Sequence, residues 1–382
     1  MKYYVAGLAF LAALAFPCSL AVAQTMRRLA PNVVLAMPVA ADMASDGAAV
    51  VADMSGPAVH YVAPDGKQKW SLTAKGSGPG DVLRPYRVAI GEGTVWVYDY
   101  SVRDVSVFSR SGKFIRRVRL SLALTVVDDI VAIGDSLLAV LGTTRHAGHE
   151  NHAIHVFDGM GVHKRSFGDV AFAVDRTKLS MSGTGTLART ARNTLLYVRK
   201  GPYQLLEYGV DGQLVRTLPP PIAIAAVVDS IVRIETNDEG RERISSRAAE
   251  IRFPVRAVPL SNGLVLSGVS DRGTLRWWLH SPGDSTVPVS LPQGLSPSSW
   301  NPKTCELVAL TELDDEPALV AVEGRKVFPS TNINTMGCKQ RSFPISQSDL
   351  RSRFFLVPPI LKPRNFLEPA AMAAMISAER TT

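Results

Sequence analysis

The chain has 382 residues, of which 46% are hydrophobic and 20% are charged, and its formal net charge is +8. This composition excludes an intrinsically disordered protein, and 29 glycines with 25 prolines favour a fold with many turns and short strands. The Lys and Arg residues are spread along the chain and form no dense cluster with aromatic residues, so the sequence predicts no nucleic-acid partner.

The N-terminus has the features of a secretory signal peptide. Lys2 precedes an uncharged apolar stretch over residues 5–16, and Ala21-Val22-Ala23 fits the small-residue rule for cleavage. We therefore predict a signal peptide over residues 1–23, with Gln24 as the first residue of the mature protein. The apolar stretch is too short for a membrane span, and no later stretch is long enough. These features predict a periplasmic or secreted protein without a transmembrane segment after signal removal.

Residues 87–120 contain four short β-prone runs separated by three turn signals. Such a four-stranded meander is the repeating unit of β-propellers. Copies recur along the chain and align on the turn between the third and fourth runs. The six turns are Asp65-Gly66, Ser111-Gly112, Gly159-Met160-Gly161, Asp211-Gly212, Gly283-Asp284 and Glu323-Gly324. Six turns predict an all-β, six-bladed β-propeller with four-stranded antiparallel blades over residues 24–340.

The strands of the other blades follow from the same alignment. The predicted strands are 48–53, 58–63 and 67–73 in the first blade, 129–133, 136–141, 153–158 and 162–167 in the third, 194–199, 203–209 and 213–218 in the fourth, 255–259, 264–269, 274–280 and 286–291 in the fifth, and 305–311, 318–323 and 325–328 in the sixth. The sixth blade has the poorest fourth run, so residues 32–36 are predicted to complete it and close the ring. Residues 341–382 are predicted to be a C-terminal tail.

The step from Gly212 to Gly283 is longer than the other steps between turns. The excess predicts an insertion at about residues 222–250, either a projecting hairpin or a short helix on one face of the disc. Insertions in repeats often carry function, but they are also the places where sequence drift is best tolerated. Both interpretations stay open from the sequence.

A glycine-rich segment between the first and second blades resembles secreted bacterial six-bladed β-propeller proteins of the NHL-repeat kind. In that family a Gly-x-Gly-Pro-Gly-Glu-Phe turn and a Pro open a blade, and an Asp closes its second strand. The matching residues are Gly76, Gly78, Pro79, Gly80, Pro85 and Asp99, whereas Asp81 and Val82 replace the usual Glu and Phe. The resemblance implies the architecture. It implies no single activity, because the family includes envelope proteins, interaction modules and a few enzymes.

The same segment also has a direct physical interpretation. Its glycines and Pro79 suit a tight connector from one blade to the next, and backbone N–H groups in such a turn could instead hold an anion. Asp99 is interpreted as a carboxylate that caps a turn by accepting backbone N–H groups, with a catalytic role as the less favoured alternative.

Histidines are concentrated in one part of the chain. His146, His149, His152 and His155 follow one another at intervals of three, and imidazoles near Glu150 could bind zinc, copper or nickel. Because side chains alternate along a strand, His152 and His155 are expected on opposite faces. This leaves His146, His149 and His152 as weak metal-site candidates. The favoured interpretation is a polar hairpin tip, and the sequence predicts no cofactor.

The number and positions of the cysteines are consistent with the predicted export. Cys18 lies in the predicted signal peptide, where Pro17 stands at a position that a lipoprotein site would fill with a small residue. Cys305 and Cys338 remain in the mature chain. In an oxidising compartment we favour a disulfide between them over two buried free thiols.

The predicted inner strands bring few chemically active side chains to the ring axis, mainly Arg87, Asp128, Asp129 and Arg189. This set is too poor in oxygen ligands for a calcium site. We therefore predict a monomeric binding or interaction protein of the bacterial envelope, with a protein or glycan partner. The rival prediction is a hydrolase or lyase at the mouth of the central channel. Convergence of three or more carboxylate, amide or imidazole groups on the axis would favour the enzyme.

Overall fold

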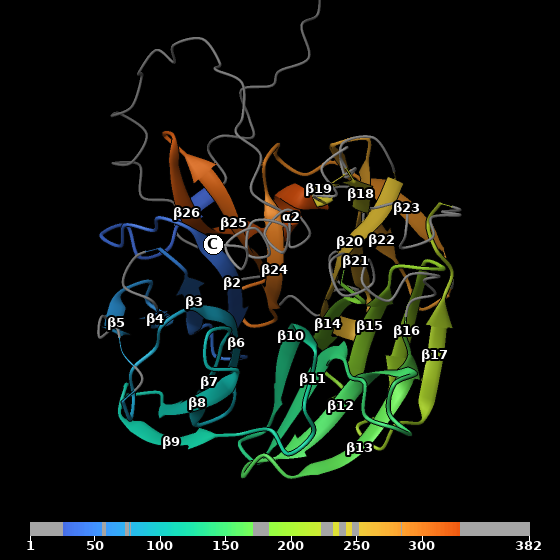
Figure 1. Cartoon of the computed structure of the whole chain (residues 1–382). Helices are drawn as coiled ribbons and strands as arrows, with labels where there is room; N and C mark the ends of the chain where they lie inside the picture. Colours follow the sequence, from blue (N-terminus) through green and yellow to red (C-terminus); the bar gives the residue numbers. More distant parts are fainter. Residues whose placement is uncertain are drawn as a thin grey trace, which may run out of the picture.

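The computed structural model describes residues 26–328, except 56–58, 73–75, 77, 171–182, 223–231, 237–241, 247–251 and 284. Six four-stranded antiparallel sheets are arranged around a central axis, as Figure 1 shows. The predicted all-β, six-bladed propeller is therefore confirmed. The predicted signal peptide, the tail 341–382 and Cys338 lie outside the described residues.

The first three blades follow one another along the chain. Blade 1 consists of β2 (Pro38–Met43), β3 (Ala49–Asp53), β4 (Val59–Val62) and β5 (Gln68–Leu72). Blade 2 consists of β6 (Pro85–Ile90), β7 (Thr94–Asp99), β8 (Asp104–Ser109) and β9 (Phe114–Val118). Blade 3 consists of β10 (Val126–Ile133), β11 (Leu137–Thr143), β12 (His152–Asp158) and β13 (His163–Asp169). Within each blade, every strand pairs with the next in sequence, from the axis outwards.

The other three blades continue around the ring. Blade 4 consists of β14 (Gly185–Arg189), β15 (Leu195–Arg199), β16 (Gln204–Tyr208) and β17 (Leu214–Leu218). Blade 5 consists of β20 (Arg252–Pro259), β21 (Val265–Asp271), β22 (Thr274–His280) and β23 (Thr286–Val289), with a 3-10 turn η4 (Ser261–Gly263) after β20. Blade 6 consists of β24 (Ser296–Asn301), β25 (Glu306–Leu313), β26 (Glu316–Glu323) and β1 (Met26–Arg28).

Ring closure differs from the prediction. The fourth strand of blade 6 is β1, which pairs with β26, and residues 32–36 form no strand. Residues 325–328, predicted as a strand, lie mostly in the short helix α2 (Gly324–Val327). As the outer strand of its blade, β1 is partly exposed. Its sequence, Met-Arg-Arg, therefore lacks the run of apolar residues that would mark it as a strand. The apolar residues that follow β1, such as Leu29 and Leu35, are buried between blades 6 and 1 instead.

The inner strands of blades 1, 4 and 6 were also absent from the prediction. These strands, β2, β14 and β24, are rich in small or polar residues and have one edge free toward the axis. Five of the six inner strands have a register shift at equivalent places: Pro38/Ala40, Pro85/Arg87, Val127/Asp129, Pro254/Arg256 and Pro297/Ser299. A proline is tolerated there because it needs no ladder partner on the free edge. Such bulges re-aim the side chains that follow them.

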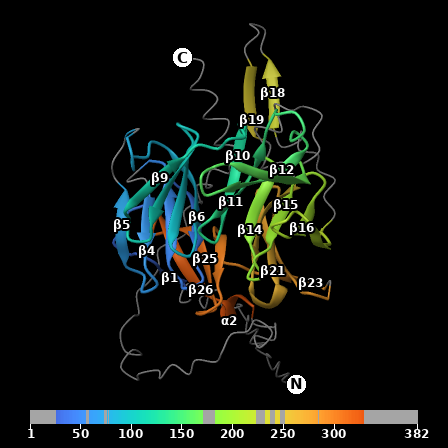
Figure 2. The same ribbon diagram turned by 90° about the horizontal axis from the view of Figure 1, so that it is seen from below.

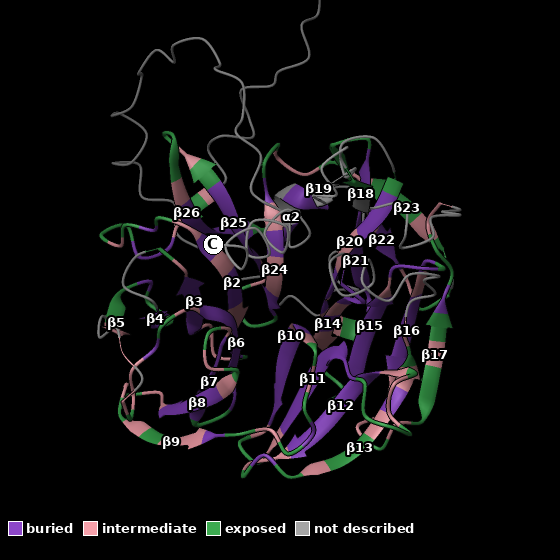
Figure 3. Ribbon diagram, in the orientation of Figure 1, coloured by how far each residue is buried: buried purple, intermediate pink, exposed green. Residues whose placement is uncertain are grey.

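The core lies between neighbouring blades. The second strands β3 and β7 are buried along their whole length, whereas the outer strands β5 and β9 are partly exposed. Figure 3 shows the same gradient around the ring, with buried segments inside and exposed ones at the rim. Apolar side chains of adjacent blades form shared clusters, for example Trp96 of blade 2 with Phe157 of blade 3. Each blade is therefore stabilised by its neighbours.

Between blades 4 and 5 the chain forms a separate two-stranded hairpin of β18 (Val232–Thr236) and β19 (Glu242–Ser246). Figure 2 shows this hairpin projecting from the end of the propeller opposite α2. Among the described residues, no helix has the length and hydrophobicity needed to cross a bilayer.

Candidate functional site

A cavity of about 760 Å³ lies on the ring axis. Its walls are the inner strands and the turns that follow them in all six blades. These turns share the face of the propeller on which α2 lies, and include the exposed residues Glu92 and Asn193. The cavity is therefore accessible from this face, which is opposite the β18–β19 hairpin (Figure 2).

Four charged side chains from four different blades line this cavity. They are Asp42 of β2, Asp129 of β10, Arg189 of β14 and Arg256 of β20. We refer to them as the axial quartet. A fifth charged residue, Glu92, lies in the turn at the mouth. Partly exposed apolar side chains such as Met43 and Leu137 also line the cavity, so its wall combines apolar and polar surface with a few convergent charges.

Backbone N–H groups hold both carboxylates of the quartet. The Asp42 carboxylate accepts the N–H of Ile90 on the neighbouring blade at 2.9 Å and that of Met43 at 2.8 Å. The Asp129 carboxylate accepts the N–H of Leu187 on its neighbouring blade and that of Ile130, both at 3.1 Å. Each carboxylate thus links two inner strands and is fixed in position.

The two guanidinium groups are held more loosely. Arg189 Nη1 donates one hydrogen bond to the carbonyl of Ala132 at 3.1 Å. Arg256 Nη2 lies 3.8 Å from Asp129 Oδ2, an ion pair longer than a hydrogen bond. Both side chains are half-buried and line the lumen.

The cavity changes the acidity of Asp42. Removal from bulk water raises the pKa of this carboxyl to about 6, even though the backbone N–H groups and the charge of Arg189 act to lower it. The nearby negative charge of Asp129 adds a smaller upward effect on the pKa. Asp42 consequently titrates close to neutrality, whereas an ordinary aspartate is fully ionised there.

Of the four axial residues that the sequence predicted, Asp129 and Arg189 line the cavity and the other two do not. The Asp128 carboxylate accepts the N–H and the hydroxyl of Thr184 at 2.7 and 2.8 Å, and burial raises its pKa. The Arg87 guanidinium lies 3.8 Å above the Tyr86 ring and donates to the Asp128 carbonyl. These two side chains therefore reinforce the channel wall.

Asp42 and Arg256 were not identified from the sequence as residues that line the axis. Asp42 lies on β2, which was not recognised as a strand, and Arg256 lay inside a predicted strand that was not identified as lining the axis. A usable signal was present, because four inner strands have a proline at the bulge, within their first three residues. The residues two and four positions after such a proline include Arg256 and Asp42.

The histidine segment forms a separate surface cluster. The rings of His146 and His149 lie 5.7 Å apart and those of His149 and His163 lie 4.7 Å apart between centroids. The Ser166 hydroxyl lies 2.8 Å from both His155 Nδ1 and His163 Nε2. Burial, together with the charge of His163, lowers the pKa of His155 to about 4.

The structure does not add support for a metal ion in this cluster. The ring of His149 meets that of His163 edge to face, and His163 was not one of the three candidates, while the candidate His152 has no ring contact with the other two. Within the described part of the chain, no group of three His, Cys, Asp or Glu side chains is arranged to hold a metal ion. The site of His146, His149 and His152 stays a hypothesis from the sequence.

The motif residues of blade 2 have structural roles. The Asp99 carboxylate accepts the N–H groups of Leu83, Arg84 and Ser101 at 2.5, 3.3 and 2.9 Å. Asp99 therefore ties the connector to the end of β7, as the turn-capping interpretation predicts. The Asp81 carboxylate likewise accepts the N–H of Gly78 at 3.1 Å within the connector.

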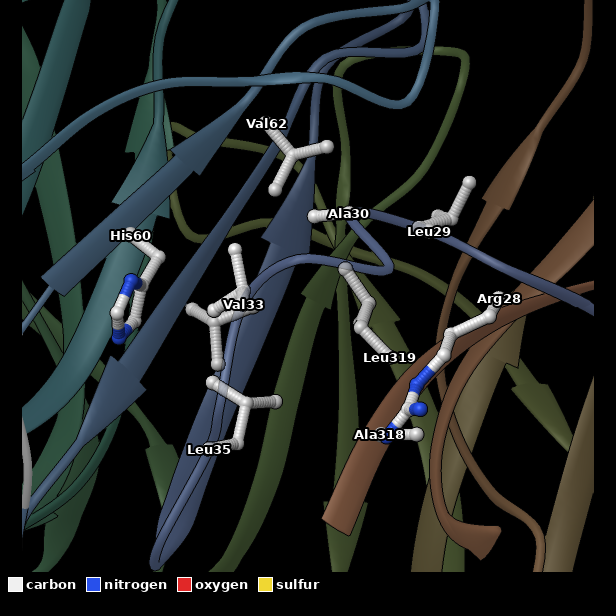
Figure 4. A pocket seen from close by; sticks show the side chains of 10 residues that line it. Arg28, Leu29, Ala30, Val33, Leu35, His60, Val62, Ala318 and Leu319 are labelled. Carbon is white, nitrogen blue, oxygen red and sulfur yellow. The ribbon is translucent and has the colours of Figure 1, made fainter. Parts of the chain in front are cut away.

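A second cavity lies at the seam where the ring closes, between β1, β26 and blade 1 (Figure 4). It is lined by apolar side chains such as Leu29 and Leu319 and by His60. Its volume of about 10 Å³ is room for one water molecule at most, so it holds no ligand.

Cys305 lies in the turn between β24 and β25 and is disulfide-bonded, with the other half of the bond outside the described residues. The pairing of Cys305 with Cys338 therefore stays a prediction.

No protein-family model matches the sequence, and no curated protein matches it. Solved structures do resemble the fold. Virginiamycin B lyase from Staphylococcus aureus is 8% identical, with 78% of this chain and 98% of that chain covered and a TM-score of 0.45. A Bacteroides fragilis protein described as exported is 9% identical, with 78% and 95% covered and a TM-score of 0.49. A DUF4221 member from Bacteroides vulgatus is 7% identical, with 78% and 95% covered and a TM-score of 0.48. These similarities concern the fold alone.

Proposed function

We propose that this chain is an exported binding protein of the bacterial envelope and that the axial cavity is its ligand site. The observation that carries the proposal is the cavity itself, which has about 760 Å³ and is walled by all six blades. Ligand sites typically have volumes of roughly 300–1,000 Å³, mostly apolar walls and a few convergent polar groups. The axial cavity has a volume in this range and several convergent charged groups, and its wall presents somewhat more polar than apolar surface. Export rests on the signal-like N-terminus of the sequence.

The construction of the site favours binding over catalysis. The two axial carboxylates are fixed by backbone N–H groups, and the inner strands that carry them are held by the rest of each blade. A preformed and rigid cavity lowers the ordering cost of binding. Among the described residues, the cavity lining contains no histidine or cysteine that could serve as a nucleophile or proton shuttle.

A cavity-filling variant tests the proposal. Ala188 lies on β14 and lines the cavity, so Ala188→Phe should reduce the space available to a ligand. Ala147→Phe on the exposed loop between β11 and β12 is the matched control. Small acids, sugars and short peptides are screened by thermal shift, and hits are measured by calorimetry. We expect Ala188→Phe to lose binding of the hits and Ala147→Phe to keep it. Equal binding by both variants would place the ligand elsewhere and refute the proposal.

The β18–β19 hairpin is the proposed contact for a protein or glycan partner, because it projects from the face opposite the cavity mouth. The wild-type protein and a variant with residues 232–246 replaced by a short Gly/Ser linker are compared in pull-downs from envelope extract. Loss of a partner from the variant is expected. An unchanged set of partners would exclude the hairpin as the contact.

A hydrolase or lyase with its site at the channel mouth is the second candidate. One observation favours it: Asp42 faces the cavity and has its pKa raised to about 6, as is typical of catalytic acids and bases. For the enzyme, Asp42→Asn should abolish turnover of a bound compound while binding remains. For the binding protein, no cavity ligand should be chemically changed, as mass spectrometry of the recovered ligand would show.

A further inference from the structure

Within the axial quartet, the carboxylates and the guanidinium groups differ in how many of their hydrogen-bonding atoms already have a protein partner. Both carboxylates have their oxygens engaged, Asp42 with Ile90 and Met43 and Asp129 with Leu187 and Ile130. Peptide N–H groups that belong to the wall thus already donate to the carboxylate oxygens.

The two guanidinium groups, in contrast, use few of their hydrogen-bond donors. Each arginine side chain has five N–H donors. Arg189 uses one toward Ala132, and Arg256 has only the 3.8 Å ion pair with Asp129. Within the described part of the chain, neither guanidinium makes a further hydrogen bond. The lumen therefore presents a surplus of charged donors, which only a ligand or water can satisfy.

The two arginines come from neighbouring blades and line the same cavity. Arg189 and Arg256 lie on β14 and β20, which are adjacent inner strands of the ring. Arg189 is the last residue of its strand, nearer the mouth, whereas Arg256 is in the middle of β20, deeper in the channel. A planar oxyanion matches the fork of an arginine, which can donate two parallel hydrogen bonds to it.

We propose that the axial cavity takes a small organic carboxylate, with the carboxylate group between Arg189 and Arg256 and an apolar body against the aliphatic wall. The partly exposed apolar residues of the lining, Met43, Leu137, Ala188 and Pro259, supply that wall from blades 1, 3, 4 and 5. The inference rests on the proposed function, because it requires the axial cavity to be a ligand site. It adds the chemical class of the ligand and the two residues that select it.

The ionisation state of Asp42 should then control the affinity of the cavity for a carboxylate. The groups that face it across the lumen are Arg189 and Asp129, with Arg256 deeper and Glu92 at the mouth. When Asp42 is ionised, the quartet has no net charge and Asp42 repels an incoming anion. When Asp42 is protonated, the arginines are in excess. Affinity for a carboxylate should therefore rise as the pH falls from about 7.5 to about 5.5, a range in which an ordinary carboxylic acid stays ionised.

Hexanoate, hexanamide and hexylamine are matched probes, because they share an apolar chain and differ in the charge of the head group. Their binding to the full mature chain is measured by calorimetry at about pH 7.5. We expect hexanoate to bind at least about tenfold more tightly than the other two. Arg189→Gln and Arg256→Gln should each weaken hexanoate binding about tenfold. Arg276→Gln should not change it, because Arg276 lies on the exposed side of blade 5 and pairs with Asp271.

Asp42→Asn provides a second measurement that does not remove a positive charge. It should tighten hexanoate binding several-fold at about pH 7.5 and abolish the dependence of affinity on pH. Circular dichroism and thermal unfolding of every variant confirm that the propeller is folded.

Preference for hexanamide or hexylamine, or equal hexanoate affinity in the wild type and both arginine variants, would overturn the inference while leaving the cavity as a ligand site. If no compound of any charge binds in a manner sensitive to Ala188→Phe, the proposed function itself is wrong.

Discussion

At the scale of single residues, buried carboxylates in the described part of this propeller are held either by backbone N–H groups, as at Asp99, or by ion pairs, as at Glu207. The Glu207 side chain is fully buried in blade 4 and is bound by Arg192 at 2.9 Å, by Arg216 at 2.5 Å and by the Thr194 hydroxyl. Burial alone would raise the pKa of this carboxyl, but the hydrogen bonds and the two positive charges outweigh it and lower the pKa. Arg216 also donates to the carbonyl of Gly263, which ties blade 4 to blade 5.

We predict that Glu207→Gln destabilises the protein by about 2 kcal/mol at neutral pH, because it leaves two arginines without their counter-charge. Since the folded-state pKa lies below the unfolded value, this stability is present above about pH 4.5 and is lost as the pH falls through the folded pKa. Urea unfolding between about pH 3 and 7 should show wild type and variant converging at acid pH. Glu316→Gln, which breaks an exposed pair with Arg28, is the control and should cost less than about 1 kcal/mol. A constant difference across this pH range would contradict the argument.

The hairpin glycines are the second residue-scale feature. Gly112 has a φ of +88°, and a Cβ there would lie 2.8 Å from Cγ of Trp70. Trp70 cannot move easily, because it stacks on Tyr61 with centroids 5.2 Å apart and its ring N–H donates to the carbonyl of Arg110.

We therefore predict that Gly112→Ala lowers stability by about 2 kcal/mol or more, from backbone strain and the clash together. Gly148→Ala is the matched control, since Gly148 has a similar φ of +84° but a Cβ there would meet no atom within 4 Å. Thermal unfolding of both variants checks the prediction. A similar loss at both glycines would mean that the approach of Trp70 is irrelevant.

At the scale of elements, the ring depends on a very short strand. Leu29 N–H donates to the carbonyl of Leu319 at 2.8 Å, so the N–H of Arg27, two residues earlier, faces the same strand. We predict that Arg27→Pro costs about 1–3 kcal/mol, because proline removes that donor. Arg27→Ala removes only the exposed ion pair with Glu306 and should cost less than about 1 kcal/mol. Equal unfolding midpoints for the two variants would show that β1 does not hold the ring closed.

The predicted Cys305–Cys338 bond would tether blade 6 to the chain that follows it. We expect mass spectrometry of the protein, digested without reductant, to yield one cross-linked peptide containing both cysteines. Two free thiols in the purified protein would exclude the pairing. A disulfide in an exported protein is expected to limit the unfolded chain and so to add stability.

At the scale of the whole molecule, the proposed export has to be compatible with ring closure. The predicted mature protein begins at Gln24, two residues before β1, so cleavage at this site would leave the closing strand complete. We predict that N-terminal sequencing of the exported protein starts at Gln24 and that light scattering finds a monomer. A start beyond Arg28 would remove β1 and would be incompatible with this closure.

The sequence determined the class of fold, because turn glycines and alternating apolar runs are local signals. Gly66, Gly112, Gly161 and Gly212 all have positive φ, as hairpin turns require. The turn at Gly324 was misassigned, since the closing strand comes from the other end of the chain and leaves no local pattern there.

Only the tertiary structure decided the candidate site. Asp42, Asp129, Arg189 and Arg256 are far apart in the sequence and meet because the inner strands of four blades surround one axis. Those inner strands have one free edge, so they need not be apolar and carry a weak sequence signal. The Asp42 pKa likewise depends on burial and on groups from other blades, which no local sequence pattern encodes. Local periodicity thus specifies the blades, whereas the chemistry of the channel arises only when the ring closes.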